Sequence, residues 1–149
     1  MLRTRTIYLA LIVFAAQLGF ARDLAVIINK ANAASTVTAA DLEKLLNLGA
    51  PTWPSGKKVK IFLTNPNSSE TKTVLPRAFK MTSAEIKSLA EAHTADIQIV
   101  GSDDVVLTMV DNNPGAIGIV NVYSINSQVK VLKIDGKLPM EQGYLLHGN

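Results

Sequence analysis

The chain has 149 residues, a length typical of one domain, and 48% of them are hydrophobic, which excludes large-scale disorder. It contains no cysteine, which excludes disulfides, thiolate metal sites and a cysteine nucleophile. The net charge is +3, and the dense basic run at residues 57–60 lacks the interleaved aromatic residues of a single-stranded nucleic-acid site. We therefore expect a folded protein with no nucleic-acid partner.

Residues 1–21 have the order of charged, apolar and small residues that is typical of a secretory signal peptide. Two arginines precede an apolar stretch over residues 7–18, and small residues occupy the −3 and −1 positions of a cleavage site after Ala21. The stretch is shorter than the ~20 residues of a membrane-spanning helix, which disfavours a membrane anchor. We predict a cleaved signal peptide, one domain over residues 22–149, and a periplasmic or secreted location.

Strand and helix signals alternate along the predicted domain. Short apolar runs predict buried strands at residues 24–28, 59–63, 97–100, 116–120 and 129–134. Capping residues before apolar periodic segments predict four helices, which begin after Thr38, Asn67 or Ser68, Thr82 and Ser102. Strands separated by helices predict an α/β fold with a mostly parallel sheet flanked by helices.

The segment DNNPGAIGIVNV, residues 111–122, combines a helix end, a turn and a buried strand. Pro114 disfavours helical geometry at the residue before it, so the last predicted helix ends there. Gly115 can adopt backbone angles that are closed to other residues, a positive φ among them, which suits it to the turn. Gly118, inside the strand, indicates a close approach of another backbone or of a ligand.

Three segments of the chain resemble the phosphate-binding proteins of ABC transporters: DLAVIINKANAASTVTAADLEKLL, DDVVLTMVDNNPGAIGIVNV and VKVLKIDG. They occur in the family's order, and the resemblance as a whole covers nearly all of residues 23–136. The resemblance implies a lobe of the type II periplasmic-binding-protein fold, in a short single-lobe member that captures a solute outside the inner membrane. The Gly/Ser-rich anion loop that the family carries in its N-terminal segment has no counterpart here.

The resemblance also implies an anion site in the loop after the second predicted strand. In the family this loop carries an Arg and a Gly-Ser-Gly-Thr-like sequence at a helix N-terminus, where hydroxyls and N–H groups hold dehydrated phosphate. The corresponding TNPNSSETKT offers Thr64, Ser68, Ser69 and Thr71 as ligand-binding candidates. Thr64 lies near the place of the family's Arg, and Glu70 stands where the family favours Thr. The alternative interpretation is that Ser68 and its neighbours only cap a helix.

Catalytic signals are weak throughout the sequence. Neither Gly-X-Ser-X-Gly nor Ser-X-X-Lys is present. His93 is placed near a helix end and His147 in a loose tail, and the adjacent Asp103 and Asp104 are explained as first-turn helix acids. We therefore expect no enzyme activity, no metal and no cofactor.

Two functions remain after these exclusions. The first is capture of phosphate or a similar small oxyanion for uptake, with an ABC transporter permease as a possible partner. The alternative is a protein-interaction domain of the same fold, which binds another envelope protein and no solute. A hydrolase is a distant third.

Overall fold

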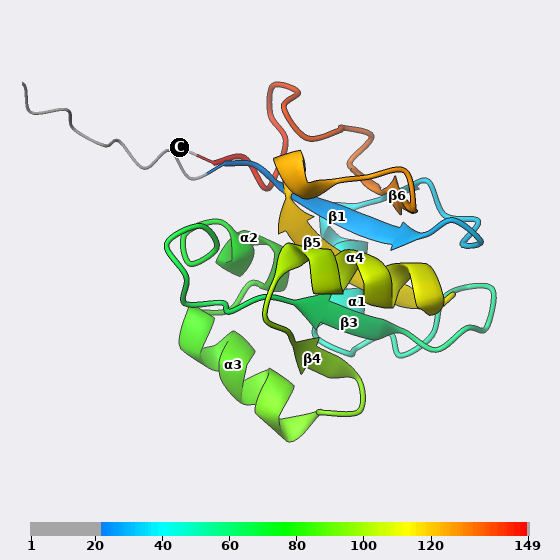
Figure 1. Cartoon of the computed structure of the whole chain (residues 1–149), viewed down its shortest axis with the longest axis horizontal. Helices are drawn as coiled ribbons and strands as arrows, with labels where there is room; N and C mark the ends of the chain where they lie inside the picture. The colour runs from blue at the N-terminus through cyan, green and yellow to red at the C-terminus, as the bar shows by residue number, and fades with distance from the viewer. Residues whose placement is uncertain (1–21, 149) are drawn as a thin grey trace, which may run out of the picture.

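A computed structural model describes residues 22–148, so the predicted signal peptide lies outside the described residues. Five strands form one sheet in the order β4-β3-β5-β1-β6 (Figure 1). Their bounds are Leu24–Asn29 for β1, Lys60–Leu63 for β3, Ile97–Ile99 for β4, Ala116–Asn121 for β5 and Val129–Val131 for β6. A separate pair of short parallel strands joins β2, Thr36–Val37, to β7, Lys133–Ile134.

The predicted α/β class is confirmed, but the sheet is mixed rather than mostly parallel. β3 runs parallel to β4 and β5. β1 runs antiparallel to both of its neighbours, β5 and β6. All six residues of β1 are buried, and a strand covered on both faces reads as a continuous apolar run whichever way it points. The sequence pattern therefore predicted the strand but not its direction.

The helices begin where the sequence places their caps, with one exception. They span Ala39–Leu46 for α1, Leu75–Phe79 for α2, Ser83–Ala92 for α3 and Asp103–Asn112 for α4. Thr38, Thr82 and Ser102 each accept a hydrogen bond from the main-chain N–H three residues ahead, at 3.0, 3.2 and 3.3 Å, as helix N-caps do. Within residues 22–148, no helix has both the length and the apolar character needed to cross a membrane.

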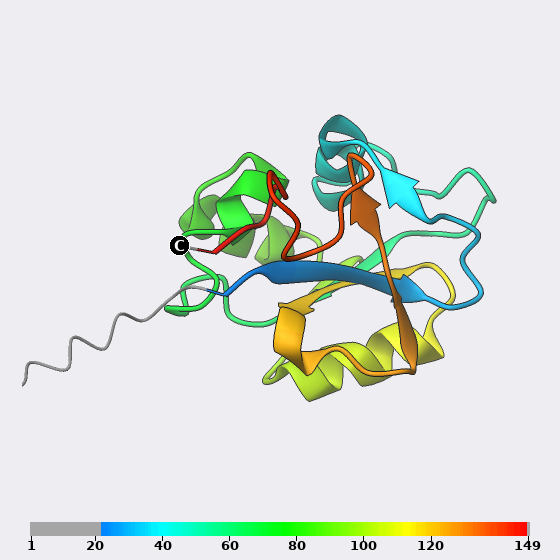
Figure 2. The same cartoon turned by 90° about the horizontal axis from the view of Figure 1, so that it is seen from above.

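Two layers of helices cover the sheet (Figure 2). On one face lies α4, whose Val106 and Val110 pack against Ala25 and Ile27 of β1. On the other face, α1, α2 and α3 contribute to a larger core that includes the alternate β1 residues, Leu24, Val26 and Ile28. Because helices cover both faces of the sheet, a ligand site is expected at the ends of the strands.

The turn between α4 and β5 requires glycine for a reason other than the predicted one. Gly115 is not among the glycines with a positive φ. A Cβ at Gly115 would lie 2.0 Å from the main-chain oxygen of Lys58, so the close approach of the segment before β3 excludes a side chain. A Cβ at Gly118 would meet Val106 and Val110 of α4 at 2.6 and 2.8 Å. The space at Gly118 is therefore filled by a helix and not by a ligand.

Candidate functional site

The candidate anion loop leaves the sheet at the carboxyl end of β3. Its first residue, Thr64, is half-buried and follows Leu63, whose oxygen accepts a hydrogen bond from the N–H of Val100 after β4. β5 ends at the same edge of the sheet because it is parallel to β3. Ligands of open α/β sheets bind outside the carboxyl ends of the parallel strands, so the loop lies at the expected edge.

The loop is closed by its own hydrogen bonds. The buried Thr71 donates its hydroxyl proton to the oxygen of Asn65 at 2.8 Å. The Thr71 oxygen lies 2.7 Å from the Ser68 hydroxyl, and because the Thr71 proton is already used, Ser68 is the donor of that bond. Two of the four candidate residues therefore have no hydroxyl proton left for an anion.

The helix that was predicted to begin after Asn67 or Ser68 is not formed there. Residues 66–74 are a series of turns, in which Ser68 donates its N–H to Asn65 and accepts from the N–H groups of Thr71 and Lys72. α2 begins only at Leu75, and its N-cap residue, Val74, makes no side-chain capping bond. Pro76 fits the first turn of a helix because that turn does not need its N–H. It therefore belongs to the start of α2 and does not interrupt a longer helix.

Besides Thr64, whose N–H and hydroxyl make no hydrogen bond among the described residues, Ser69 and Glu70 keep free hydrogen-bond donors. Both residues are exposed, and no hydrogen bond among the described residues uses either main-chain N–H or the Ser69 hydroxyl. Free N–H groups on consecutive residues favour an anion. The Glu70 carboxylate, exposed on the same turn, opposes one, although water screens its charge. The loop therefore offers fewer donors than its sequence indicates.

Two carboxylates near this edge already have hydrogen-bond partners. Asp103, in the first turn of α4, accepts at Oδ2 from the N–H of Asn121 at 3.0 Å and from the Ser124 hydroxyl at 2.7 Å. It thereby ties the end of β5 and the 3-10 helix η1, Val122–Ser124, to α4. No group of three or more His, Asp or Glu side chains in residues 22–148 is arranged to hold a metal ion.

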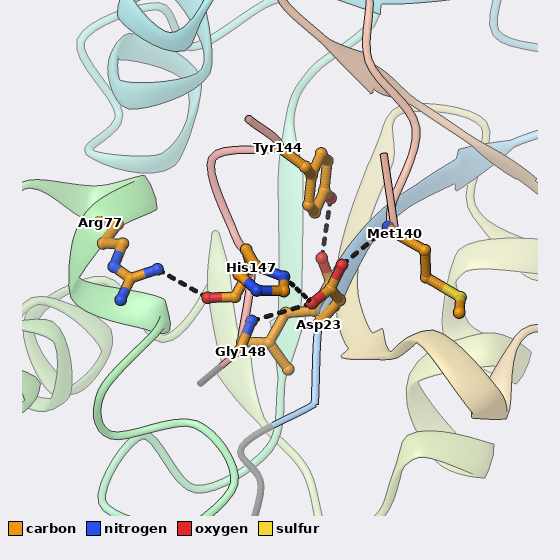
Figure 3. A network of polar contacts seen from close by, with 7 residues as sticks. Asp23, Arg77, Met140, Tyr144, His147 and Gly148 are labelled. Atoms are coloured by element: carbon orange, nitrogen blue, oxygen red, sulfur yellow. Dashed lines mark hydrogen bonds and ion pairs between the residues drawn. The ribbon is translucent and has the colours of Figure 1, made fainter. Parts of the chain in front are cut away.

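The second carboxylate, Asp23, fixes the C-terminal segment, which the sequence predicted to be loose. Asp23 is 7% exposed. Its oxygens accept from Nδ1 of His147 at 2.7 Å, from the N–H of Gly148 at 2.9 Å and from the N–H of Met140 at 2.7 Å (Figure 3). The prediction of a loose tail is wrong, because the partner of His147 lies at the far end of the sequence.

Further contacts hold the same segment against β1 and α2. The buried Tyr144 donates its hydroxyl to the oxygen of Leu24 at 2.8 Å, and Leu24 donates its N–H to Leu146. Arg77 of α2 donates to the oxygen of His147 at 2.6 Å. Sequence reasoning missed Arg77 and Asp23, and the only local signal was the position of Asp23 directly before a buried strand.

The protonation states of this cluster follow from its hydrogen bonds. Burial by itself raises the pKa of Asp23, but the N–H groups of Gly148 and Met140 and the His147 ring outweigh it and hold the pKa below its usual value. Burial, together with the nearby Asp23 charge, raises the pKa of Tyr144 well above its usual range. At neutral pH the cluster therefore contains an ionised Asp23 and a neutral Tyr144.

Comparisons with known proteins give relatives that are named as phosphate-binding proteins. No family model matches the chain. Over 84 residues, 56% of this chain, it is 38% identical to "Phosphate-binding protein PstS 2" of Streptococcus agalactiae serotype V, and the match spans 29% of that protein. The same values apply to the protein of that name from serotype III.

Solved structures give the same result at lower sequence identity. An ABC-type phosphate transport receptor from Vibrio cholerae superposes with a TM-score of 0.69 at 18% identity, covering 87% of this chain and 55% of the receptor. PstS from Borrelia burgdorferi gives 0.66 at 18% identity, covering 85% and 55%. A putative phosphate transporter substrate-binding protein from Clostridium perfringens, with bound phosphate, gives 0.64 at 18% identity, covering 78% and 46%.

The match therefore extends over most of this chain and about half of each structural relative. The fold is that of one part of a phosphate-transport binding protein, as the resemblance implied. In sequence and in fold, the chain is similar to the substrate-binding proteins of phosphate ABC transporters.

Proposed function

We propose that the chain is an exported solute-binding protein that captures phosphate or a similar small oxyanion for uptake by an ABC transporter. The observation that carries the proposal is the 38% identity to a protein named for phosphate binding. The fold shared with a phosphate-bound relative supports it. A binding role needs no catalytic group, which agrees with the weak catalytic signals of the sequence.

The proposed contact surface is the loop at the carboxyl end of β3. Of the four candidates, Ser69 offers a free hydroxyl and Thr64 is half-buried at the start of the loop. Ser68 and Thr71 shape the loop by their mutual hydrogen bond. With no Arg at position 64 and with Glu70 on the turn, we expect weak binding.

Calorimetric titration of the exported chain with phosphate, and separately with sulfate, tests this function. Weak, saturable heat with phosphate is the expected result. The absence of saturable heat with both anions at millimolar concentration would contradict the proposal.

The second candidate function is an interaction domain of the same fold that binds another envelope protein. It is favoured by the self-closed loop, in which the hydroxyl protons of Ser68 and Thr71 are used internally, and by the exposed Glu70 carboxylate. Two results together would favour this candidate. Crosslinking in intact cells would recover one defined protein partner, and the purified chain would bind no anion.

A further inference from the structure

A groove of about 650 Å³ lies between β2, α1 and the turn that precedes β3. We call it the Trp53 groove. Its walls come from these three segments, which Figure 2 shows above the sheet, in the upper middle and upper right of the view. The volume is within the range of small-molecule sites.

The floor of the groove is apolar and held in one conformation. Trp53 is 3% exposed, and its Nε1–H donates to the oxygen of Gly115 at 3.0 Å. The turn around it is closed by the bonds from Trp53 N–H to Lys57 and from Gly56 N–H to Trp53, both at 2.8 Å. Because the ring is almost fully covered and its N–H is already used, the apolar surface open to a ligand comes from Val37, Ala50 and Pro54 beside it.

The rim carries one charge of each sign. Asp41 and Lys44 are three residues apart on α1, so their side chains lie on the same side of the helix. Both are exposed, and among residues 22–148 no hydrogen bond or ion pair uses the Asp41 carboxylate or the Lys44 ammonium. A carboxylate and an ammonium above an apolar floor match a ligand that has both charges and an apolar group.

The groove is far from the loop of the proposed function. Trp53 is bonded to Gly115, directly before β5 begins, whereas the loop starts after β3 ends. Because β3 and β5 are parallel, the two places lie at opposite ends of the sheet. A ligand in the groove therefore does not depend on anion binding in the loop.

We propose that the Trp53 groove binds a small zwitterion of the class of apolar and aromatic α-amino acids. The apolar side chain packs on Val37, Ala50 and Pro54, directly beside Trp53. The ammonium group contacts Asp41 and the carboxylate contacts Lys44. A rim of balanced charge disfavours a multiply charged anion, which separates this ligand class from phosphate.

Trp53 is the only tryptophan of the chain, so its fluorescence, excited at wavelengths where neither tyrosine nor phenylalanine absorbs, reports on this groove alone. L-Phenylalanine is the probe, and phenethylamine and 3-phenylpropionate each lack one of its charges. We expect a saturable change with L-phenylalanine at concentrations up to about 10 mM, the range of weak binding, and at least about fivefold weaker binding of either analogue.

Charge variants assign the two contacts. Asp41→Asn should weaken the binding of L-phenylalanine but leave the binding of 3-phenylpropionate unchanged. Lys44→Met should weaken the binding of L-phenylalanine but leave the binding of phenethylamine unchanged. Lys87→Met on α3, which removes an exposed ammonium remote from the groove, is the matched control. No saturable change with the wild type, or equal binding of all three probes, would overturn the proposal. Phosphate titration of the same samples keeps the outcome for the loop separate.

Discussion

The His147 ring and the Asp23 carboxylate are joined by a hydrogen bond of 2.7 Å, although the residues are 124 positions apart in the sequence. The same carboxylate accepts from the main-chain N–H groups of Met140 and Gly148. One side chain directly before β1 therefore fixes both the beginning and the end of the segment from residue 140 to residue 148 (Figure 3).

Replacing Asp23 by Asn should lower the free energy of unfolding by ~1–3 kcal/mol, because an uncharged amide is a weaker acceptor for the three hydrogen bonds, which are buried or partly buried. Urea unfolding at neutral pH measures the loss. Asp111→Asn is the control, since Asp111 is exposed and its carboxylate makes no hydrogen bond among the described residues. Equal losses in the two variants would contradict the role given to Asp23.

The hydrogen bonds of the Asp23 carboxylate also predict how the stability of the fold depends on pH. The pKa of Asp23 is lowered in the folded chain from its ordinary value of 3.8. The unfolded state therefore takes up the proton first, so this contribution to stability is present above pH 3.8 and is lost as the pH falls through the folded pKa. Wild type should lose more stability below pH 4 than Asp23→Asn. Parallel pH profiles of the two proteins would be the contrary outcome.

The glycines around β5 should differ sharply in their tolerance of a methyl group. Gly115→Ala should cost ~1–3 kcal/mol because its Cβ would lie 2.0 Å from the Lys58 oxygen, and Gly118→Ala should cost a similar amount by crowding α4. Gly101→Ala is the control, since no atom lies within 4 Å of its Cβ position. Thermal unfolding of the three variants makes the comparison, and similar melting temperatures would show that β5 is packed less closely than described.

Restoring the family's chemistry in the loop should raise anion affinity. Thr64→Arg combined with Glu70→Thr adds a bidentate cation and removes a like charge, so phosphate affinity should rise at least about tenfold, or ~1.4 kcal/mol. Calorimetry measures both proteins. If neither gives heat with phosphate, the loop is not an anion site and the interaction-domain function is favoured.

Two single variants separate binding from loop structure. Ser69→Ala removes a free hydrogen-bond donor, so it should weaken the binding of phosphate without changing the free energy of unfolding. Ser68→Ala breaks the bond to Thr71 and should also lower stability by ~0.5–1.5 kcal/mol.

Export should remove residues 1–21 and leave Arg22 at the N-terminus, or a residue within a few positions of it. The arrangement of charged, apolar and small residues there is the reason for this prediction. An intact mass of the exported chain measures the cleavage point. Recovery of the full precursor mass from a membrane fraction would indicate an anchor instead.

The sequence by itself determined the features that depend on residues close together in the chain. Thr38, Thr82 and Ser102 were identified as helix caps because a capping residue bonds to an N–H only three positions away. Buried strands were visible as apolar runs, and the α/β class followed from their alternation with helices. The candidate loop could be placed after β3 because it follows that strand directly in the sequence and the family resemblance supplies the motif.

Tertiary structure decided whatever depends on partners distant in the sequence. The direction of β1 is set by its pairing with β5 and β6, which an apolar run does not encode. Which hydroxyls of the loop stay free depends on how the turns fold back, and this leaves Ser69 free but not Ser68. The tail is ordered because His147 meets Asp23, a contact between opposite ends of the described chain that no local pattern records.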